Sequence, residues 1–144
     1  METHFRKLER MYLSAPLNEQ LYKGITLNIS HEKAELSLKV EEKFFHAAHA
    51  IHGSVYFKML DDAAFFAVNS IVKDVFVYTV SFNVQLLRPV SSGIIRSVGE
   101  LKFKSNNLFI ADSALFDEKG KLAGRGSGNF MKSKIELTES IGYK

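Results

Sequence analysis

The segment from residue 53 to residue 72 is the feature that most constrains the fold of this chain. Its apolar side chains fall on nearly every face of a helix, so other structure must wrap around it and not merely pack on one side. At about 1.5 Å per residue this helix is roughly 30 Å long, the length of a strand of about nine or ten residues. The segment therefore predicts a buried helix with a sheet curled around it.

The sequence around this segment predicts strands connected by short turns, preceded by one helix over residues 5–13 that ends at Pro16. We therefore expect an α+β fold in a single domain over residues 1–144. It has an N-terminal helix within residues 1–17, an antiparallel sheet of five to six strands and a tail over residues 133–144. The expected strands are 25–30, 34–40, 75–87, 94–104, 108–116 and 121–132.

Composition excludes several classes of function. The chain has 144 residues, of which 46% are hydrophobic and 24% charged, as is typical of soluble globular proteins. It has no cysteine, which excludes disulfides, thiolate zinc sites and cysteine nucleophiles. We see no secretory signal or apolar run of membrane-spanning length, so we expect a cytoplasmic protein without a membrane partner. The net charge of +3 is spread among acidic residues, which fits a phosphorylated small molecule better than nucleic acid.

Two adjacent carboxylates, Asp61 and Asp62, interrupt the apolar surface of the central helix. Burial raises the pKa of a carboxyl group and is costly, so each of them needs a partner or a function. Lys58 lies one turn before Asp62, and an ordinary helical ion pair accounts for that aspartate. Asp61 has apolar neighbours at helical spacing. Unless the backbone or Lys58 forms a hydrogen bond or an ion pair with its carboxylate, Asp61 is the candidate catalytic residue.

Three histidines, His46, His49 and His52, precede the central helix at intervals of three. Imidazole and carboxylate groups suit zinc, but positions three and six residues apart diverge around a helix, and the His-Glu-x-x-His spacing is absent. We therefore expect no metal ion, and a metal hydrolase stays an alternative that a chelator would inhibit. His52 is expected mainly to hold the loop to the helix through ring hydrogen bonds, and His49 to lie in a solvated loop.

Alternate glycines occur at Gly124, Gly126 and Gly128 within an expected strand. No helical pattern follows them, so the dinucleotide-binding fingerprint is not met. Ser127 lies inside this strand and not at a strand-to-helix turn, which gives a serine nucleophile no support. The glycines are expected to clear one face of the strand, so that the central helix or a partner chain can pack closely.

Several motifs together resemble the hotdog-fold acyl-CoA thioesterases of the phenylacetate-pathway (PaaI-like) family. The resemblance covers about residues 20–132 and follows the family's order and spacing. It implies hydrolysis of a thioester to a free acid and coenzyme A without a cofactor. It also implies a homodimer or a homotetramer, a dimer of dimers, with the acyl-CoA held between subunits. The motifs are His52-Gly53-Ser54, then Asp61, then Thr79-Val-Ser-Phe-Asn83-Val-Gln-Leu-Leu-Arg88-Pro89 and Asp117-Glu-Lys-Gly120-Lys-Leu-Ala.

The resemblance implies a catalytic role for four residues, beside the mainly structural His52. Asp61 would act as general base on water or as nucleophile, and the Gly53 N–H, at the helix N-terminus, would contact the thioester oxygen. Family members usually have asparagine where this chain has His46. A neutral histidine can replace an amide hydrogen bond or act as the base itself. Thr79 would help to position the water.

Six further residues are expected to bind the substrate: Ser54 and Asn83 within the motifs, and Arg88, Lys102, Lys104 and Arg125 as cations for the phosphate and adenosine end. Two other functions stay open, a non-catalytic acyl-CoA or acyl-carrier-protein binding module and a hotdog dehydratase or hydratase. Release of free thiol from a panel of acyl-CoAs distinguishes hydrolysis from binding.

Overall fold

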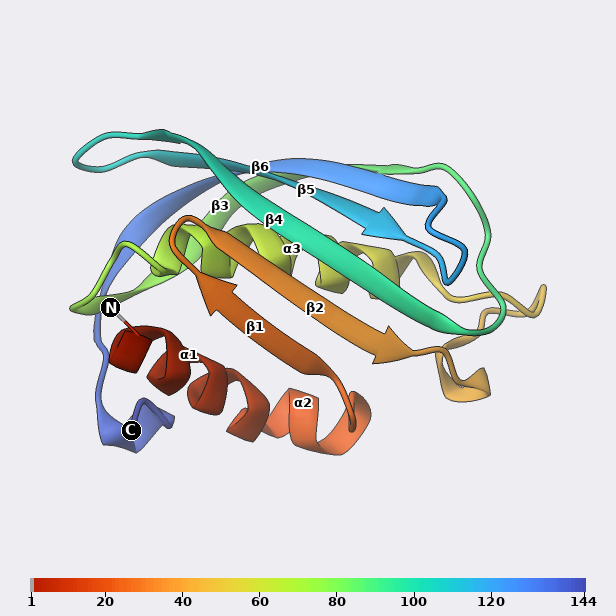
Figure 1. Ribbon diagram of the computed structural model, residues 1–144, viewed down its shortest axis with the longest axis horizontal. Helices are drawn as coiled ribbons and strands as arrows, with labels where there is room; N and C mark the ends of the chain where they lie inside the picture. The colour runs from red at the N-terminus through yellow and green to blue at the C-terminus, as the bar shows by residue number, and fades with distance from the viewer. Residues whose placement is uncertain (1) are drawn as a thin grey trace.

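A six-stranded antiparallel sheet curls around one long helix, α3 (Gly53–Asn69), in the computed structural model, which describes residues 2–144 (Figure 1). The strand order across the sheet is β1-β2-β4-β5-β6-β3. The expected α+β architecture of a sheet around a central helix is therefore confirmed. The strands are β1 (Thr26–Ser30), β2 (Lys33–Lys39), β3 (Val75–Leu86), β4 (Ile94–Lys104), β5 (Phe109–Phe116) and β6 (Leu122–Glu136); the other helices are α1 (Glu2–Ser14), α2 (Pro16–Leu21) and two 3-10 turns, η1 (Glu42–Phe44) and η2 (Glu139–Ile141).

Helix α3 packs directly against the backbone of β4. A Cβ atom at Gly99 would lie 2.1 Å from the carbonyl oxygen of Ala63, so only glycine permits this approach. The helix ends at Asn69, three residues before the expected position. The buried Asn69 amide donates to the carbonyls of Val72 and Val75, which turns the chain toward β3. No helix among residues 2–144 is long and apolar enough to cross a membrane.

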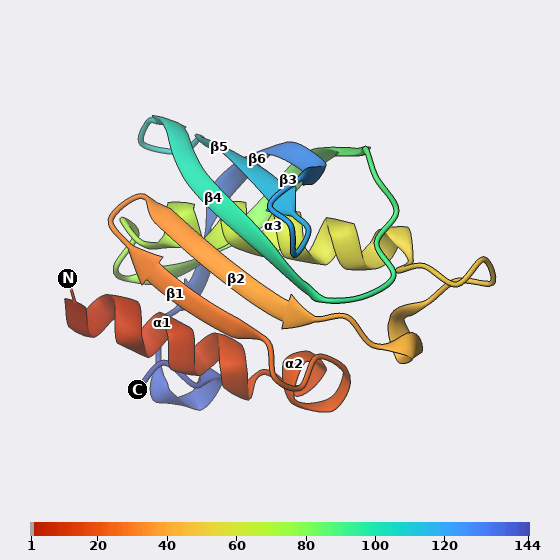
Figure 2. The same ribbon diagram turned by 45° about the vertical axis from the view of Figure 1, so that its right-hand side comes forward.

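The N-terminal region contains two helices where one was expected. Helix α1 ends at Ser14, before Pro16 as expected, but Pro16 then begins a second short helix, α2. Proline fits the first turn of a helix because its missing N–H has no intrahelical acceptor at that position. The buried face of α1 includes Leu8 and Tyr12, and the helix lies alongside β1 (Figure 2).

Side chains of α1 block the free edge of β1. The backbone N–H of Ile29 donates to Glu9 Oε2 at 2.7 Å, and Arg6 donates to the Ile29 carbonyl at 2.8 Å. At the opposite edge of the sheet, β3 pairs only with β6 among residues 2–144. Tyr78 and Val80 of β3 are 45% and 52% exposed. The sheet therefore has one blocked edge and one open edge.

The C-terminal segment returns to α1 after β6, which continues four residues beyond the expected end, to Glu136. Burial lowers the pKa of His4, so this ring is neutral near pH 7. Its Nε2–H donates to the carbonyl of Asn69 at 2.8 Å, because a carbonyl can only accept. Nδ1 then accepts from the Tyr143 hydroxyl at 2.7 Å. His4 thus joins α1 to the end of α3 and to the C-terminal segment.

Candidate active site

Asp61 forms a hydrogen bond with Thr79, which donates from its hydroxyl to the Asp61 carboxylate at 2.8 Å. The register between β3 and β6 shifts between Thr79 and Ser81, which leaves Val80 as an extra residue in β3. Such bulges redirect side chains and are common beside functional sites. The structure therefore brings together two of the expected site residues, one from α3 and one from β3.

The Asp61–Thr79 pair lies between two aromatic pairs that, like it, join α3 to β3. Three successive turns of α3 each contact β3 through one residue, and these residues are spaced four apart on the helix. The ring centroids in the first aromatic pair are 5.6 Å apart and those in the second 5.1 Å. The carboxylate is thus bounded on both sides by apolar rings. The three pairs are Phe57–Phe82, Asp61–Thr79 and Phe65–Phe76.

Burial raises the pKa of Asp61 to about 6. The hydrogen bond from Thr79 and the charge of Lys58 act in the opposite direction, and the charge of Asp62 adds to the increase. A carboxylate with a pKa near neutrality is ionised at pH 7 and is still basic enough to take a proton from water. Asp61 therefore has the properties of a general base.

Asp62 forms the expected ion pair with Lys58, with Nζ 2.8 Å from Oδ2. The same oxygen also accepts a hydrogen bond from the Tyr12 hydroxyl at 2.6 Å. The Lys58 ammonium lies 5.1 Å and 4.7 Å from the ring centroids of Tyr12 and Tyr22. Lys58 thus pairs with Asp62 and not with Asp61. Tyr12, the second partner of Asp62, lies fifty residues away, and no local pattern predicted this contact.

The N-terminus of α3 presents one free backbone donor. His52 caps the helix, since its Nδ1 accepts from the Ser54 N–H at 3.0 Å and lies 2.9 Å from the Ser54 hydroxyl. These are the ring hydrogen bonds expected for His52. They also occupy the N–H of Ser54, a residue that was expected to bind the substrate. Among residues 2–144, the Gly53 N–H has no acceptor, and it lies at the positive end of the helix.

His46 lies in the exposed loop before α3. Its Nδ1 accepts from the Ala48 N–H at 3.0 Å, so in the neutral ring the proton is on Nε2. His49 is exposed, as expected, and has a positive φ of 66°. Among the residues that the structure describes, no group of three or more His, Cys, Asp or Glu side chains is arranged to hold a metal ion.

Gly53 and Asp61 of one chain are too far apart to act on the same carbonyl group. They are eight residues apart on one helix, which corresponds to about 12 Å along its axis. A general base and an oxyanion donor must each come within about 3 Å of the atoms on which they act. One protomer therefore holds two separate parts of the expected site.

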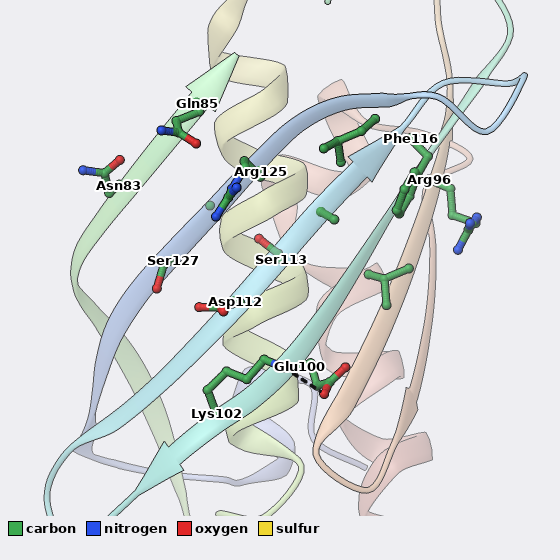
Figure 3. Close-up of a pocket in the computed structure, with 14 residues that line it drawn as sticks. Asn83, Gln85, Arg96, Glu100, Lys102, Asp112, Ser113, Phe116, Arg125 and Ser127 are labelled. Atoms are coloured by element: carbon green, nitrogen blue, oxygen red, sulfur yellow. Dashed lines mark hydrogen bonds and ion pairs between the residues drawn. The ribbon is translucent and has the colours of Figure 1, made fainter. Parts of the chain in front are cut away.

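Three of the expected substrate-binding residues lie on the outer face of the sheet, away from α3. Asn83, Lys102 and Arg125 line a cavity of ≈ 860 Å³ on the outer face, with α3 behind the sheet (Figure 3). Lys104 pairs with Glu32 at 3.2 Å. The remaining cation, Arg88, follows β3 near the start of α3.

The backbone carbonyl of Arg88 accepts a hydrogen bond from the hydroxyl of Tyr56, in the first turn of α3. Leu86, two residues before Arg88, lies 3.3 Å from the position that a Cβ atom at Gly53 would occupy. Arg88 is therefore an expected cation that lies near the N-terminus of α3.

The alternate glycines of β6 have two different neighbours. Gly124 faces α3, where a Cβ atom would lie 3.3 Å from the Tyr56 ring, as expected. At Gly126 and Gly128, however, a Cβ atom would come within 2.3 Å and 2.4 Å of the Phe82 ring. These two glycines therefore make room for an aromatic side chain of the adjacent strand and not for the helix.

Comparison with known proteins gives a family and a fold. Residues 48–123 match the model of the thioesterase superfamily. The structure resembles the Escherichia coli PaaI protein from the phenylacetic acid degradation operon, with a TM-score of 0.84, 16% identity and coverage of 95% of this chain and 98% of that chain. A thioesterase family protein from Silicibacter pomeroyi has a TM-score of 0.81 and 18% identity, covering 90% of this chain and 97% of that chain.

A putative thioesterase from Ralstonia eutropha JMP134, described as phenylacetic acid degradation-related, has a TM-score of 0.76 and 21% identity. It covers 89% of this chain and 98% of its own. At these identities the likeness shows the fold, and the expected hotdog fold is confirmed. A search of curated proteins found no match.

Proposed function

The chain belongs to the thioesterase superfamily, and from this premise we propose that it hydrolyses acyl-CoA thioesters to a free acid and coenzyme A. One observation carries the proposal. Asp61 is a carboxylate between two aromatic pairs, with its pKa raised to about 6 by burial and its orientation set by Thr79. Nothing in the packing of α3 against the sheet requires a charge at this position.

The proposed reaction uses Asp61 as the base. Its carboxylate takes a proton from a water molecule, and the water oxygen attacks the carbonyl carbon of the thioester. The carbonyl oxygen becomes an oxyanion, which the free Gly53 N–H at the helix N-terminus stabilises. The intermediate then collapses, the carbon–sulfur bond breaks, and the coenzyme A thiolate takes the proton from Asp61. Direct attack by the Asp61 carboxylate is the other route open to the same group.

A complete site requires two protomers, because Gly53 and Asp61 of one chain lie about 12 Å apart along α3. We assign the pairing of protomers to β3, whose edge is open and carries the exposed Tyr78 and Val80. In a two-fold dimer, each site would combine Gly53 of one protomer with Asp61 of the other. A tetramer would be a dimer of such dimers.

His46 and Arg88 complete the proposed site. His46 carries its proton on Nε2, since Nδ1 already accepts from Ala48, and so it can donate a hydrogen bond as the usual asparagine would. This favours a role in orienting the carbonyl or the water over a role as base. Arg88 is the cation best placed for the phosphate end of coenzyme A.

The deciding experiment measures free thiol released from a panel of acyl-CoAs by the wild type and by Asp61→Asn. We expect the variant to lose about 10²- to 10⁴-fold in kcat, because the amide cannot accept the proton. Asp112→Asn, a matched change on the outer face of the sheet, serves as the control. Full activity of Asp61→Asn on every thioester that the wild type hydrolyses would show that the catalytic assignment is wrong.

The same panel tests the alternative of a binding module, which the histidine at position 46 favours because it replaces the usual asparagine. Tight binding of acyl-CoAs by the wild type without release of thiol from any of them would replace hydrolysis by binding as the function.

A further inference from the structure

Phe57 lies midway between Gly53 and Asp61 on one side of α3. The three residues are spaced four apart, so they occupy successive turns on the same side of the helix. A Cβ atom at Gly53 would contact Leu86 of β3, and the Phe57 ring packs against Phe82 of the same strand, with centroids 5.6 Å apart. Phe57 is therefore about 6 Å along the helix axis from each of the two groups proposed to act on the thioester.

The surface around Phe57 is apolar and open to solvent. The Phe57 side chain is 44% exposed, and Leu86, which lies beside Gly53, is 54% exposed. The next residue, Leu87, is 50% exposed. Exposed apolar side chains that gather at one place indicate a surface that contacts a partner or a ligand. In this protomer, that surface adjoins both halves of the proposed site.

Two-fold symmetry determines what Phe57 faces in the proposed dimer. There, Gly53 of one protomer is opposite Asp61 of the other, and the symmetry axis repeats this pairing in reverse. The two α3 helices then run antiparallel past each other, so the residue midway between the paired positions is opposite its own copy. That residue is Phe57. The Phe57 rings of the two protomers would therefore meet at the symmetry axis, between the two sites.

We infer that the paired Phe57 rings limit the length of the acyl group, an inference that rests on the proposed thioesterase function and its two-protomer site. The coenzyme A branch of the thioester leads away from the axis, toward Arg88 near the start of α3. The acyl branch leaves the carbonyl carbon on the other side and so runs toward the axis. It meets the Phe57 rings after about 6 Å. Short acyl groups fit in front of the rings, whereas longer chains must displace them.

The first test removes the rings with Phe57→Ala. We expect the ratio of kcat/KM for octanoyl-CoA to that for butyryl-CoA to rise by about tenfold or more, mainly through KM. Phe57→Leu keeps an apolar contact and should raise the ratio less. If light scattering shows that Phe57→Ala no longer assembles as the wild type does, the ratio in Phe57→Leu decides. Phe103→Ala removes a phenylalanine of similar exposure, 49%, from β4 and serves as the control.

The second test locates Phe57 in the assembly without measuring activity. The chain has no cysteine, so Phe57→Cys has one thiol per protomer, and a short bismaleimide can join only the two copies of position 57. We expect a covalent dimer on a denaturing gel. Phe103→Cys, the matched control on β4, should give none.

The outcomes separate this inference from the proposed function. Suppose that the wild type releases thiol, but that Phe57→Cys does not cross-link or that neither Phe57→Ala nor Phe57→Leu changes the chain-length ratio. The inference is then wrong, while the thioesterase proposal stands. A wild type that releases no thiol from any acyl-CoA would overturn the proposed function, and this inference with it.

Discussion

At the scale of single residues, the protonation of Asp61 sets the conditions under which the proposed reaction runs. Its pKa is raised to about 6, above the ordinary value of an aspartate, because burial disfavours the charged form. The carboxylate is the active form of a general base. Activity should therefore be low below pH 6 and should rise as the pH increases through 6. The hydroxyl of Thr79 opposes the increase, since its hydrogen bond favours the charged form.

Thr79→Val removes that hydrogen bond with little change in shape. We expect the midpoint of the kcat/KM profile against pH to lie near 6 in the wild type and to move upward in the variant. Ser81→Ala removes a hydroxyl two residues further along β3, where its partner is Asn129, and should leave the midpoint in place. A midpoint that moves downward in Thr79→Val would contradict the role assigned to this hydrogen bond.

The backbone donor at Gly53 can be removed by a substitution that suits the start of a helix. Proline suits the first position of a helix, and His52 has the extended backbone, with φ −64° and ψ 148°, that proline requires before it. Gly53→Pro should therefore fold but lose the N–H, and kcat should fall about 10²- to 10³-fold. Gly53→Ala adds a Cβ atom and keeps the N–H. Equal losses in the two variants, measured as thiol release, would exclude the oxyanion role.

The contacts of the site that could be predicted are those between residues close together in the sequence. The pair of Lys58 and Asp62 follows from helical spacing alone, and the cap by His52 follows from its place at the helix start. Thr79 and Asn83 are four residues apart in a strand and were expected to serve one site. The bulge at Val80 reverses the alternation of side chains, so Thr79 faces α3 and Asn83 the outer face. Nothing in the sequence marks that extra residue.

At the scale of elements, the site depends on how closely α3 approaches the sheet. Gly99 of β4 meets the backbone of α3 at Ala63, midway along the helix and two residues after Asp61. This close approach positions the turn of α3 that carries Asp61 at a fixed depth in the curled sheet. The sequence predicted a wrapped helix from its apolar surface. The point of contact was not predictable, because it depends on the pairing of β4 with its neighbours.

Gly99→Ala should be strongly destabilising. Its Cβ atom would lie 2.1 Å from the Ala63 carbonyl oxygen, and neither backbone can move without disrupting the core. We expect a loss of about 4 kcal/mol or more in the free energy of unfolding, measured by urea denaturation. The control is Ser97→Ala on the same strand, whose buried hydroxyl has no partner within residues 2–144, so its removal should cost less than about 0.5 kcal/mol. A Gly99→Ala protein as stable as the control would show that the contact can relax.

At the scale of the whole molecule, we expect the two parts of the proposed site, the free N–H of Gly53 and the carboxylate of Asp61, to come together through assembly. In the proposed dimer the open edge of β3 provides the surface, and Val80 on this strand is 52% exposed. Val80→Arg would place like charges near the two-fold axis of the proposed dimer. We expect this variant to run as a monomer in light scattering and to lose about tenfold or more in activity at the same protein concentration.

Leu13→Arg makes the same change at an exposed residue of α1 and should leave the dimer intact. A Val80→Arg protein that is monomeric and fully active would contradict the two-protomer site. Mixing subunits gives an independent check. Asp61→Asn and Gly53→Pro chains, each inactive alone, should recover about a quarter of the wild-type activity when they are allowed to exchange, because half of the dimers then contain one intact site.

The block of the β1 edge by Arg6 and Glu9 has a consequence for how far assembly can proceed. A sheet with two open edges can add copies at both ends without limit, as fibres do. Here Arg6 and Glu9 of α1 occupy the carbonyl and the N–H of Ile29 on β1, which leaves β3 as the edge where we expect the sheet to be extended. We therefore expect assembly through β3 to end at a particle of finite size, because α1 hinders the addition of a further copy at β1.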